Sequence, residues 1–296
     1  MQLGLVGLGR MGGPMAARLV KAGHDVVGTD TAPDAAAASR QAGVRVAGSI
    51  AALVDLLTPP RAVWVMVQAG AATEAVLDEL AELLEPGDLV ADGGNSDWRD
   101  ATTRADRFGA RGVQFVDVGV SGGRQGWRHG YGLTAGGAPD DVERLMPVLT
   151  SLAAPGAVAR VGEHGAGHFV KAVHNAVEYG LLQAYAEGFA MLSARDGLDA
   201  LTAMRVWQAG CSARSFLLEQ TVEALSGDPA LTGVGTAVAD SGMGRWTAEE
   251  AIRLGVATPV LTAALHARFT SRDEQRRADR LLVAARGTIG GHETHV

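Results

Sequence analysis

A glycine-rich turn stands directly after the first strand that the sequence predicts. Residues 2–6 form a short apolar run, and residues 14–22 have the pattern of a helix. Between them Gly7, Gly9 and Gly12 stand at the spacing G-x-G-x-x-G. In this context Gly7 permits the tight turn, Gly9 lets a diphosphate approach the backbone, and Gly12 allows the helix to pack closely on the strand. The positive end of the helix faces the phosphates, so the start of the chain predicts a dinucleotide-binding α/β fold.

The second predicted strand indicates which dinucleotide is bound. Residues 24–29 form this strand, and it ends at Asp30, 18 residues after Gly12. An acid at this point holds both ribose hydroxyls of NAD and repels the 2′-phosphate of NADP, and Thr31 and Ala32 offer no arginine for that phosphate. We therefore expect NAD as the cofactor. The predicted cofactor contacts are Gly7, Leu8, Gly9, Arg10, Met11, Gly12, Asp30, Val67, Gln68 and Asn95.

Strands and helices continue to alternate as far as residue 164. Further strands are predicted at residues 62–67, 88–91, 113–118 and 130–135, and helices at residues 35–42, 49–57, 72–84 and 139–153. This alternation is typical of a doubly wound parallel sheet of the Rossmann type.

Two glycine-rich loops follow neighbouring strands of the predicted sheet. Residues 92–96, with Asn95, follow one strand, and residues 119–123, with Ser121, follow the next. Either loop by itself could be a plain tight turn. Because both stand at the carboxyl ends of strands, where such sheets bind ligands, together they indicate a polar site.

Residues 165–195 contain no proline and predict one long helix. Lys171, His174, Asn175 and Glu178 stand at i, i+3, i+4 and i+7 and share a face. An apolar stripe lies on another face and consists of Val170, Val173, Val177, Leu181, Ala184 and Met191. The polar face could be an ordinary exposed surface with a His174–Glu178 pair, or it could carry chemistry.

The lysine content favours chemistry. Of the 26 basic residues only Lys21 and Lys171 are lysines, and the others are arginines. An amine can gain and lose a proton, whereas a guanidinium stays charged, so Lys171 is a candidate acid/base. The alternative is a lysine whose amine simply reaches solvent.

After the long helix only helices are predicted. They lie at residues 199–207, 212–226, 247–254, 259–270 and 273–285. Thr247 and Glu250 predict a capping box at the start of the third of these. We therefore expect a Rossmann domain at residues 1–164 and an all-α domain at residues 165–296, opened by the long helix.

Composition excludes several classes of protein. The net charge of −7 gives no general attraction to nucleic acid or to an anionic membrane. No apolar run reaches the ~18 residues of a membrane span, and no signal peptide precedes the first strand. A single cysteine, Cys211, excludes an internal disulfide, and no cluster has metal-ligand spacing. A cytoplasmic protein without a metal is expected.

Four motifs together resemble the decarboxylating 6-phosphogluconate dehydrogenases, in the short form that is similar to NAD-preferring bacterial enzymes. They are GLGRMG, DGGNS, GVSGG and GHFVKAVHNAVEYG. The wider β-hydroxyacid dehydrogenases share the glycine turn, the Ser-Gly-Gly loop and the Lys171–Asn175 pair. His174 and Glu178-Tyr179 distinguish the narrower family.

The resemblance implies a reaction of the pentose phosphate pathway and of gluconate utilization. The C3 hydroxyl of 6-phosphogluconate is oxidised by hydride transfer to NAD, C1 is lost as CO₂, and the enediol is protonated to give ribulose 5-phosphate. Lys171 resembles the base that takes and returns the hydroxyl proton, and Glu178 resembles the acid that protonates C1 of the enediol. His174 and Asn175 complete the predicted catalytic set. The implied substrate contacts are Asn95, Ser121, Gly122, Gly123, His174, Asn175, Tyr179, Ser241, Arg268, Arg286 and His292.

The chain departs from the longer members of the family in two respects. Ser241 and Met243 stand where those members have a phosphate-binding lysine and threonine, so a poorer phosphate pocket is expected. The large C-terminal helical repeat is also absent. By resemblance, we expect a homodimer or homotetramer in which Arg286 and His292 reach a neighbouring subunit's site.

Two other functions remain open on the sequence alone. A β-hydroxyacid dehydrogenase would act on another small hydroxy acid and form NADH without CO₂. A non-catalytic NAD sensor is disfavoured, because it would have no reason to keep Lys171 and Glu178.

Overall fold

The chain forms two compact units in the computed structural model, which describes residues 1–290. The first unit comprises Met1–His174 and the second begins at Asn175. The division lies inside helix α8 (Ala166–Ser193), which is uninterrupted, as its lack of proline predicts. The domain boundary expected between residues 164 and 165 stays a prediction.

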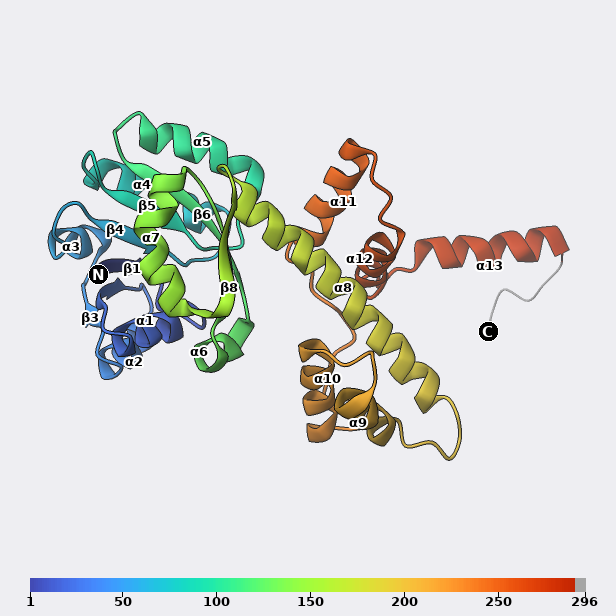
Figure 1. Ribbon diagram of the computed structural model, residues 1–296. Helices are drawn as coiled ribbons and strands as arrows, with labels where there is room; N and C mark the ends of the chain where they lie inside the picture. Colours follow the sequence, from blue (N-terminus) through green and yellow to red (C-terminus); the bar gives the residue numbers. More distant parts are fainter. Residues whose placement is uncertain (291–296) are drawn as a thin grey trace. The chain divides into compact units, whose positions relative to one another are not determined.

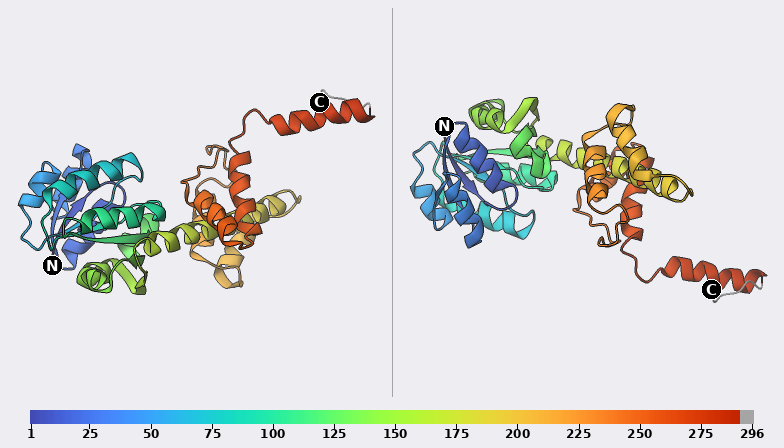
Figure 2. Two further views of the ribbon diagram at one scale, coloured as in Figure 1. Left: turned by 90° about the horizontal axis from the view of Figure 1, so that it is seen from above. Right: turned by 90° about the horizontal axis from the view of Figure 1, so that it is seen from below.

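One eight-stranded sheet organises the first unit (Figures 1 and 2). Its strands are β1 (Gln2–Val6), β2 (Asp25–Thr29), β3 (Arg45–Val46), β4 (Ala62–Val65), β5 (Leu89–Asp92), β6 (Gln114–Ser121), β7 (Tyr131–Gly136) and β8 (Ala153–Gly162). Their order is β3-β2-β1-β4-β5-β6-β7-β8, and all neighbours are parallel except β6 and β7. Strands β2 and β3 lie on one side of β1, and β4 and the later strands lie on the other, so the strand order reverses between β1 and β4. Open sheets bind ligands at such a switch point.

Helices cover both faces of this sheet (Figure 1). They are α1 (Gly12–Lys21), α2 (Pro33–Gln41), α3 (Ile50–Asp55), α4 (Ala71–Leu83), α5 (Trp98–Gly109), α6 (Gly126–His129) and α7 (Pro139–Leu152), with a 3₁₀ turn at Gly123–Gln125. Alternate residues of β1 face opposite ways: Leu3 and Leu5 pack with α1 and α7, whereas Val6 packs with α3, α4 and α5. Burial on both faces explains why a central strand such as β4 is apolar throughout.

The structure corrects the strand and helix assignment in several places. Helices α5 and α6 and strands β3 and β8 were not expected, and β7 runs antiparallel to β6. The inner face of α5 includes Arg104 beside Ala101 and Phe108, so its apolar periodicity is weak. Strand β8 contains Pro155 and Gly156, which a strand tolerates because it lies at the edge of the sheet.

The second unit contains only helices among its described residues. After α8 they are α9 (Ala200–Gly210), α10 (Phe216–Gly227), α11 (Met243–Leu254), α12 (Pro259–Thr270) and α13 (Arg277–Gly290). Tyr185 of α8 packs with buried side chains of α9 and α10, and Tyr179 packs with Ala264 and Leu265 of α12. Across residues 1–290, no helix combines the length and the apolar character that a bilayer span requires.

The predicted capping box at Thr247 is wrong. Helix α11 begins four residues earlier, at Met243, because Gly242 turns the chain with φ 92°. Thr247 is therefore in the second turn, where its hydroxyl donates to the carbonyl oxygen of Met243 at 2.9 Å. Glu250 pairs with Arg253.

The predicted polar face of α8 is divided, because Lys171 and Asn175 are buried, Glu178 is half-buried and His174 is exposed. Lys171, Asn175 and Tyr179, spaced by four residues, are at most 8% exposed. The apolar stripe is open to solvent: Val177 is 43% exposed and Leu181 is 41% exposed. A lysine and an asparagine buried beside an open apolar stripe are unusual for a surface helix, and they favour the reading that these side chains carry chemistry.

Candidate functional site

The glycine turn after β1 has the geometry that a dinucleotide needs. Gly7 has φ 98°, and a Cβ on it would lie 2.3 Å from the carbonyl oxygen of Met66. A Cβ on Gly12 would lie 1.9 Å from the carbonyl oxygen of Gly7, so α1 packs against the turn without a side chain. Beside Gly9 there is open space. No side chain caps the N-terminus of α1, so the positive end of this helix is open to a diphosphate.

Asp30 links this turn to the end of β2. One carboxylate oxygen accepts a hydrogen bond from the backbone N–H of Leu8 at 2.6 Å, and the other accepts from that of Ala32 at 2.7 Å. The sequence reasoning missed the bond to Leu8. Each carboxylate oxygen keeps a second lone pair, so Asp30 can still accept from ribose hydroxyls while it holds the turn.

The remaining predicted cofactor residues lie on neighbouring loops. Val67 and Gln68 follow β4, next to β1 in the sheet, and a Cβ on Gly7 would lie 2.9 Å from Val67 Cγ1. Asn95 is exposed in the loop after β5. Arg10 is exposed on the glycine turn. Gly9, Arg10, Gln68 and Asn95 are exposed, the other predicted residues are at least partly buried, and the set surrounds the switch point of the sheet.

Lys171 and Ser121 form the centre of a polar site in the first unit. The Lys171 ammonium donates to the Ser121 hydroxyl at 3.0 Å, and Ser121 Oγ lies 3.5 Å from His174 Nδ1. Gly122, with φ 120°, and Gly123, with φ 49°, then turn the chain away. The predicted Ser-Gly-Gly loop thus lies against the predicted base.

A cavity of about 350 Å³ adjoins these residues. Its polar lining comes from Ser121, Thr134, Lys171 and His174, and its apolar lining includes Leu133, Val158 and Val170. A mostly apolar cavity with a few converging polar groups is the usual form of a small-molecule site.

A second polar cluster lies in the second unit. The Tyr179 hydroxyl lies 3.2 Å from Ser241 Oγ and accepts from the backbone N–H of Ser241 at 3.3 Å. The Arg268 guanidinium lies 3.6 Å from the centre of the Tyr179 ring and donates to the carbonyl oxygen of Ala239. Three of the predicted substrate residues are thereby brought together.

Met243 is fully buried beside this cluster. Its sulfur accepts a hydrogen bond from the Asn175 side-chain amide at 3.0 Å. The methionine that replaces the threonine of the longer enzymes therefore packs inward and orients a predicted catalytic residue.

Two further predicted residues lie on α8 and α13. Glu178 is half-buried on α8, two turns after Lys171. Arg286 is exposed on α13, and His292 lies outside the described residues. Within residues 1–290 no group of three or more acids, histidines or cysteines could hold a metal ion.

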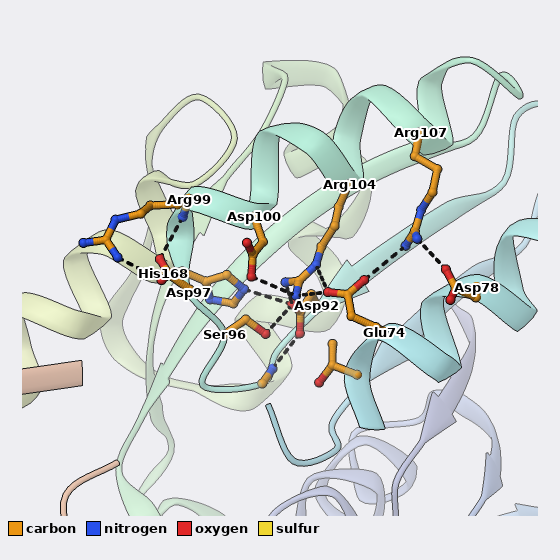
Figure 3. Close-up of polar contacts among 12 residues, drawn as sticks. Glu74, Asp78, Asp92, Ser96, Asp97, Arg99, Asp100, Arg104, Arg107 and His168 are labelled. Atoms are coloured by element: carbon orange, nitrogen blue, oxygen red, sulfur yellow. Dashed lines mark hydrogen bonds and ion pairs between the residues drawn. The ribbon is translucent and has the colours of Figure 1, made fainter. Parts of the chain in front are cut away.

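A buried charge network lies below the Asn95 loop, and the sequence reasoning missed it (Figure 3). Asp92, at the end of β5, accepts from Gly94 N–H, the Ser96 hydroxyl, Arg104 and His168. Arg104 also binds Glu74 of α4. Burial opposes ionisation of Asp92, but His168 and Arg104 lower the pKa of its carboxyl to about 2. The sequence signal that could have revealed this network was Asp92, a single acid at the end of an apolar strand, because a carboxylate buried there needs partners.

Comparisons with known proteins agree across the chain. Residues 2–165 match the NAD binding domain of 6-phosphogluconate dehydrogenase, and residues 167–291 match the C-terminal domain of 6-phosphogluconate dehydrogenase. The NAD(+)-dependent decarboxylating 6-phosphogluconate dehydrogenase of Haloferax volcanii is 40% identical over 99% of this chain and 98% of that protein.

Two solved structures are similar along most of their length. The 6-phosphogluconate dehydrogenase of Plasmodium falciparum, solved with NADP+ and with 6-phosphogluconate, has a TM-score of 0.82 and 25% identity. The matched region covers 100% of this chain and 66% of the Plasmodium chain, as expected for a short form. The 3-hydroxyisobutyrate dehydrogenase of Salmonella typhimurium has a TM-score of 0.77 and 27% identity, covering 90% of this chain and 92% of that one.

Proposed function

Because this chain belongs to the 6-phosphogluconate dehydrogenase family, we propose that it converts 6-phosphogluconate to ribulose 5-phosphate and CO₂ with NAD. The observation that carries the proposal is the buried Lys171 ammonium, which donates to the Ser121 hydroxyl at 3.0 Å. In a chain with only two lysines, an amine held in this way is suited to proton transfer.

The residues of the turn after β1 fit NAD. Gly9 leaves open space beside the backbone, the N-terminus of α1 is uncapped, and Asp30 is held where ribose hydroxyls would be bound. Bound NAD would accept the hydride from substrate C3. A 2′-phosphate would meet the Asp30 carboxylate, so NADP is the poorer cofactor.

Lys171 and Glu178 divide the proton transfers. Lys171 takes the proton of the C3 hydroxyl, so the oxygen electron pair can form the C3 carbonyl. When the C1–C2 bond breaks, its electrons move toward that carbonyl, and Lys171 returns the proton to the oxygen while CO₂ leaves. Glu178 then protonates the carbon that lost CO₂, and Lys171 takes the hydroxyl proton back, which leaves the ketone of ribulose 5-phosphate. Ser121 keeps the amine in place, and His174 and Asn175 bind substrate hydroxyls.

The phosphate end of the substrate is assigned to Tyr179, Ser241 and Arg268. The Arg268 guanidinium and two hydroxyls can bind an anion, and the N-terminus of α11 adds uncapped N–H groups. Asn95, Gly122 and Gly123 complete the contacts to the carboxylate and hydroxyl groups.

A shared active site completes the proposal. Leu281, Leu282 and Ile289 of α13 are each more than 60% exposed, which supports a homodimer or homotetramer in which this helix meets another subunit. Arg286 and His292 would then reach the neighbouring site. A cytoplasmic location also stays a prediction.

A β-hydroxyacid dehydrogenase is the second candidate. Met243 is buried where a phosphate-binding threonine is expected, and the fold resembles a 3-hydroxyisobutyrate dehydrogenase. NADH and CO₂ should therefore be measured together on 6-phosphogluconate, gluconate and 3-hydroxyisobutyrate, with Lys171→Met as the control. Equal amounts of NADH and CO₂ from 6-phosphogluconate support the proposal. NADH without CO₂ favours the second candidate, and no turnover of any acid contradicts both.

A further inference from the structure

His168 lies at the start of α8 and is held from two directions. Asp92 of β5 and Asp117 of β6 are register partners in neighbouring parallel strands, and both are fully buried. Asp117 accepts from the backbone N–H of His168 at 2.8 Å, and Asp92 accepts from its Nε2 at 3.2 Å (Figure 3). Two adjacent strands therefore bind the main chain and the side chain of one residue, which is itself fully buried.

The imidazole is a donor to Asp92. Because a carboxylate only accepts, Nε2 must carry the proton, and Nδ1 makes no hydrogen bond with a described residue. Burial would lower the pKa of His168, but Asp92, with a smaller contribution from Asp117, raises it overall. Arg104 is the other cation facing Asp92. The His168 ring is therefore fixed by one strong, charge-assisted contact.

The first turn of α8 rests on the sheet through two glycines. A Cβ on Gly119 would lie 2.6 Å from the Lys171 Cβ, and a Cβ on Gly167 would lie 2.5 Å from the Asp117 carbonyl oxygen. Glycine-to-backbone packing sets how close the helix lies. Its rotation about the axis depends on side-chain contacts: Thr134 Oγ1 donates to the carbonyl oxygen of Gly167 at 3.1 Å, the Phe169 ring meets Trp98 edge-on, and His168 binds Asp92.

We propose that His168 is a positioning residue: together with the Thr134 and Phe169 contacts, its bond to Asp92 helps to set the rotation of α8 so that Lys171, three residues later, points at Ser121. This inference rests on the proposed role of Lys171 as the base. A rotation of ~10° would move an atom ~6 Å from the axis by ~1 Å. A misplacement of ~1 Å can lower a rate by ~100-fold. The same bond ties the helix to Asp92, at the base of the loop that carries Asn95.

The test compares two amides at position 168. The glutamine of His168→Gln can place its Nε2 donor near that of histidine, whereas the asparagine of His168→Asn is one methylene too short. His168→Asn should lower kcat by ~10- to 100-fold and leave KM for NAD within ~2-fold, because the glycine turn is untouched. His168→Gln should stay within ~3-fold of wild type.

Two controls separate positioning from general loss of stability. Val90→Ala opens a cavity in the fully buried core of the same unit and removes no hydrogen bond of the network, and it should keep its kcat at a temperature where it stays folded. Glu74→Gln changes the far end of the network, on α4, and should also keep its kcat.

A second readout does not depend on turnover. Since the chain has two lysines, protein labelled with ¹³C-lysine gives two side-chain signals, which Lys21→Arg assigns. The Lys171 signal should shift in His168→Asn and not in His168→Gln. Equal kcat for the two amides, an equal loss in Val90→Ala, or an unmoved Lys171 signal would each overturn the proposal. If wild type forms no CO₂ from 6-phosphogluconate, the proposed function fails, but the lysine signals still test the positioning.

Discussion

Lys171 is the residue on which the proposed chemistry depends most directly. Lys171→Arg keeps the positive charge and the reach to Ser121, but a guanidinium cannot release its proton. We predict a loss of kcat of ~1000-fold or more, within the range by which general bases contribute. NADH binding, followed by its fluorescence, should stay within ~3-fold. Substantial NADH formation by this variant would exclude Lys171 as the base.

Asp30 has two tasks that substitution can separate. Its carboxylate accepts from Leu8 N–H and Ala32 N–H, and it faces the ribose in the proposed complex. Asp30→Asn should weaken NAD binding, because an amide has one acceptor oxygen and loses one of these bonds. Adding Thr31→Arg should supply a partner for the 2′-phosphate and raise the NADP/NAD ratio of kcat/KM by ~10-fold or more. An unchanged ratio in steady-state assays would contradict the cofactor assignment.

By resemblance, Ser241 and Met243 stand where the longer enzymes have two phosphate-binding residues, and the structure gives them different surroundings. Ser241 lies beside Tyr179, whereas Met243 is fully buried against Asn175. Ser241→Lys should therefore lower KM for 6-phosphogluconate several-fold without changing kcat, because it adds binding charge only. Gluconate, which lacks the phosphate, serves as the control substrate. Met243→Thr should instead lower Tm by removing buried volume and the Asn175 contact.

At the scale of elements, the sequence predicted those turns and helices that a local residue pattern determines. The glycine turn and α8 follow from spacing and from the absence of proline, and both were found. Helix α11 was placed four residues late, because Thr247 and Glu250 imitate a capping box and Gly242 gave no signal of its φ 92° turn. The link between His168, Asp92 and Asp117 joins residues that are far apart in the chain. Only strand register brings them together, so spacing could not reveal it.

The same network predicts how the first unit responds to acid. The pKa of Asp92 is lowered from 3.8 to about 2, so its stabilising effect is complete above pH ~4 and is lost as the pH falls through about 2. The difference corresponds to about 2 kcal/mol. His168 has a raised pKa, so its contribution is complete below its ordinary 6.5 and declines at higher pH.

Thermal unfolding of Asp92→Asn checks this expectation. Followed by circular dichroism from pH ~2 to pH ~7, wild type should show its highest Tm between pH ~4 and ~6.5. The variant should have a lower Tm at pH ~6 and a weaker decrease toward pH ~2. Parallel curves for the two proteins would show that Asp92 does not cause the acid sensitivity.

At the scale of the whole molecule, the exposed side of α13 raises the question of which subunit Arg286 serves. Leu282 and Ile289 on this helix are 63% and 87% exposed, which is costly for a helix that has no partner. If α13 completes the site of a neighbouring subunit, an active site contains Lys171 from one chain and Arg286 from another. Lys171→Met and Arg286→Ala should then each be nearly inactive.

Mixing these two variants decides the question. In an isologous dimer, co-refolding equal amounts makes about half of the dimers mixed, and one of the two sites in each mixed dimer has both wild-type residues. NADH formation should therefore recover to about a quarter of the wild-type rate. Differently tagged subunits, purified over both tags, show that mixed dimers have formed. If such dimers are no more active than their components, Arg286 acts within its own subunit or has no catalytic task, because no mixed site would then be complete.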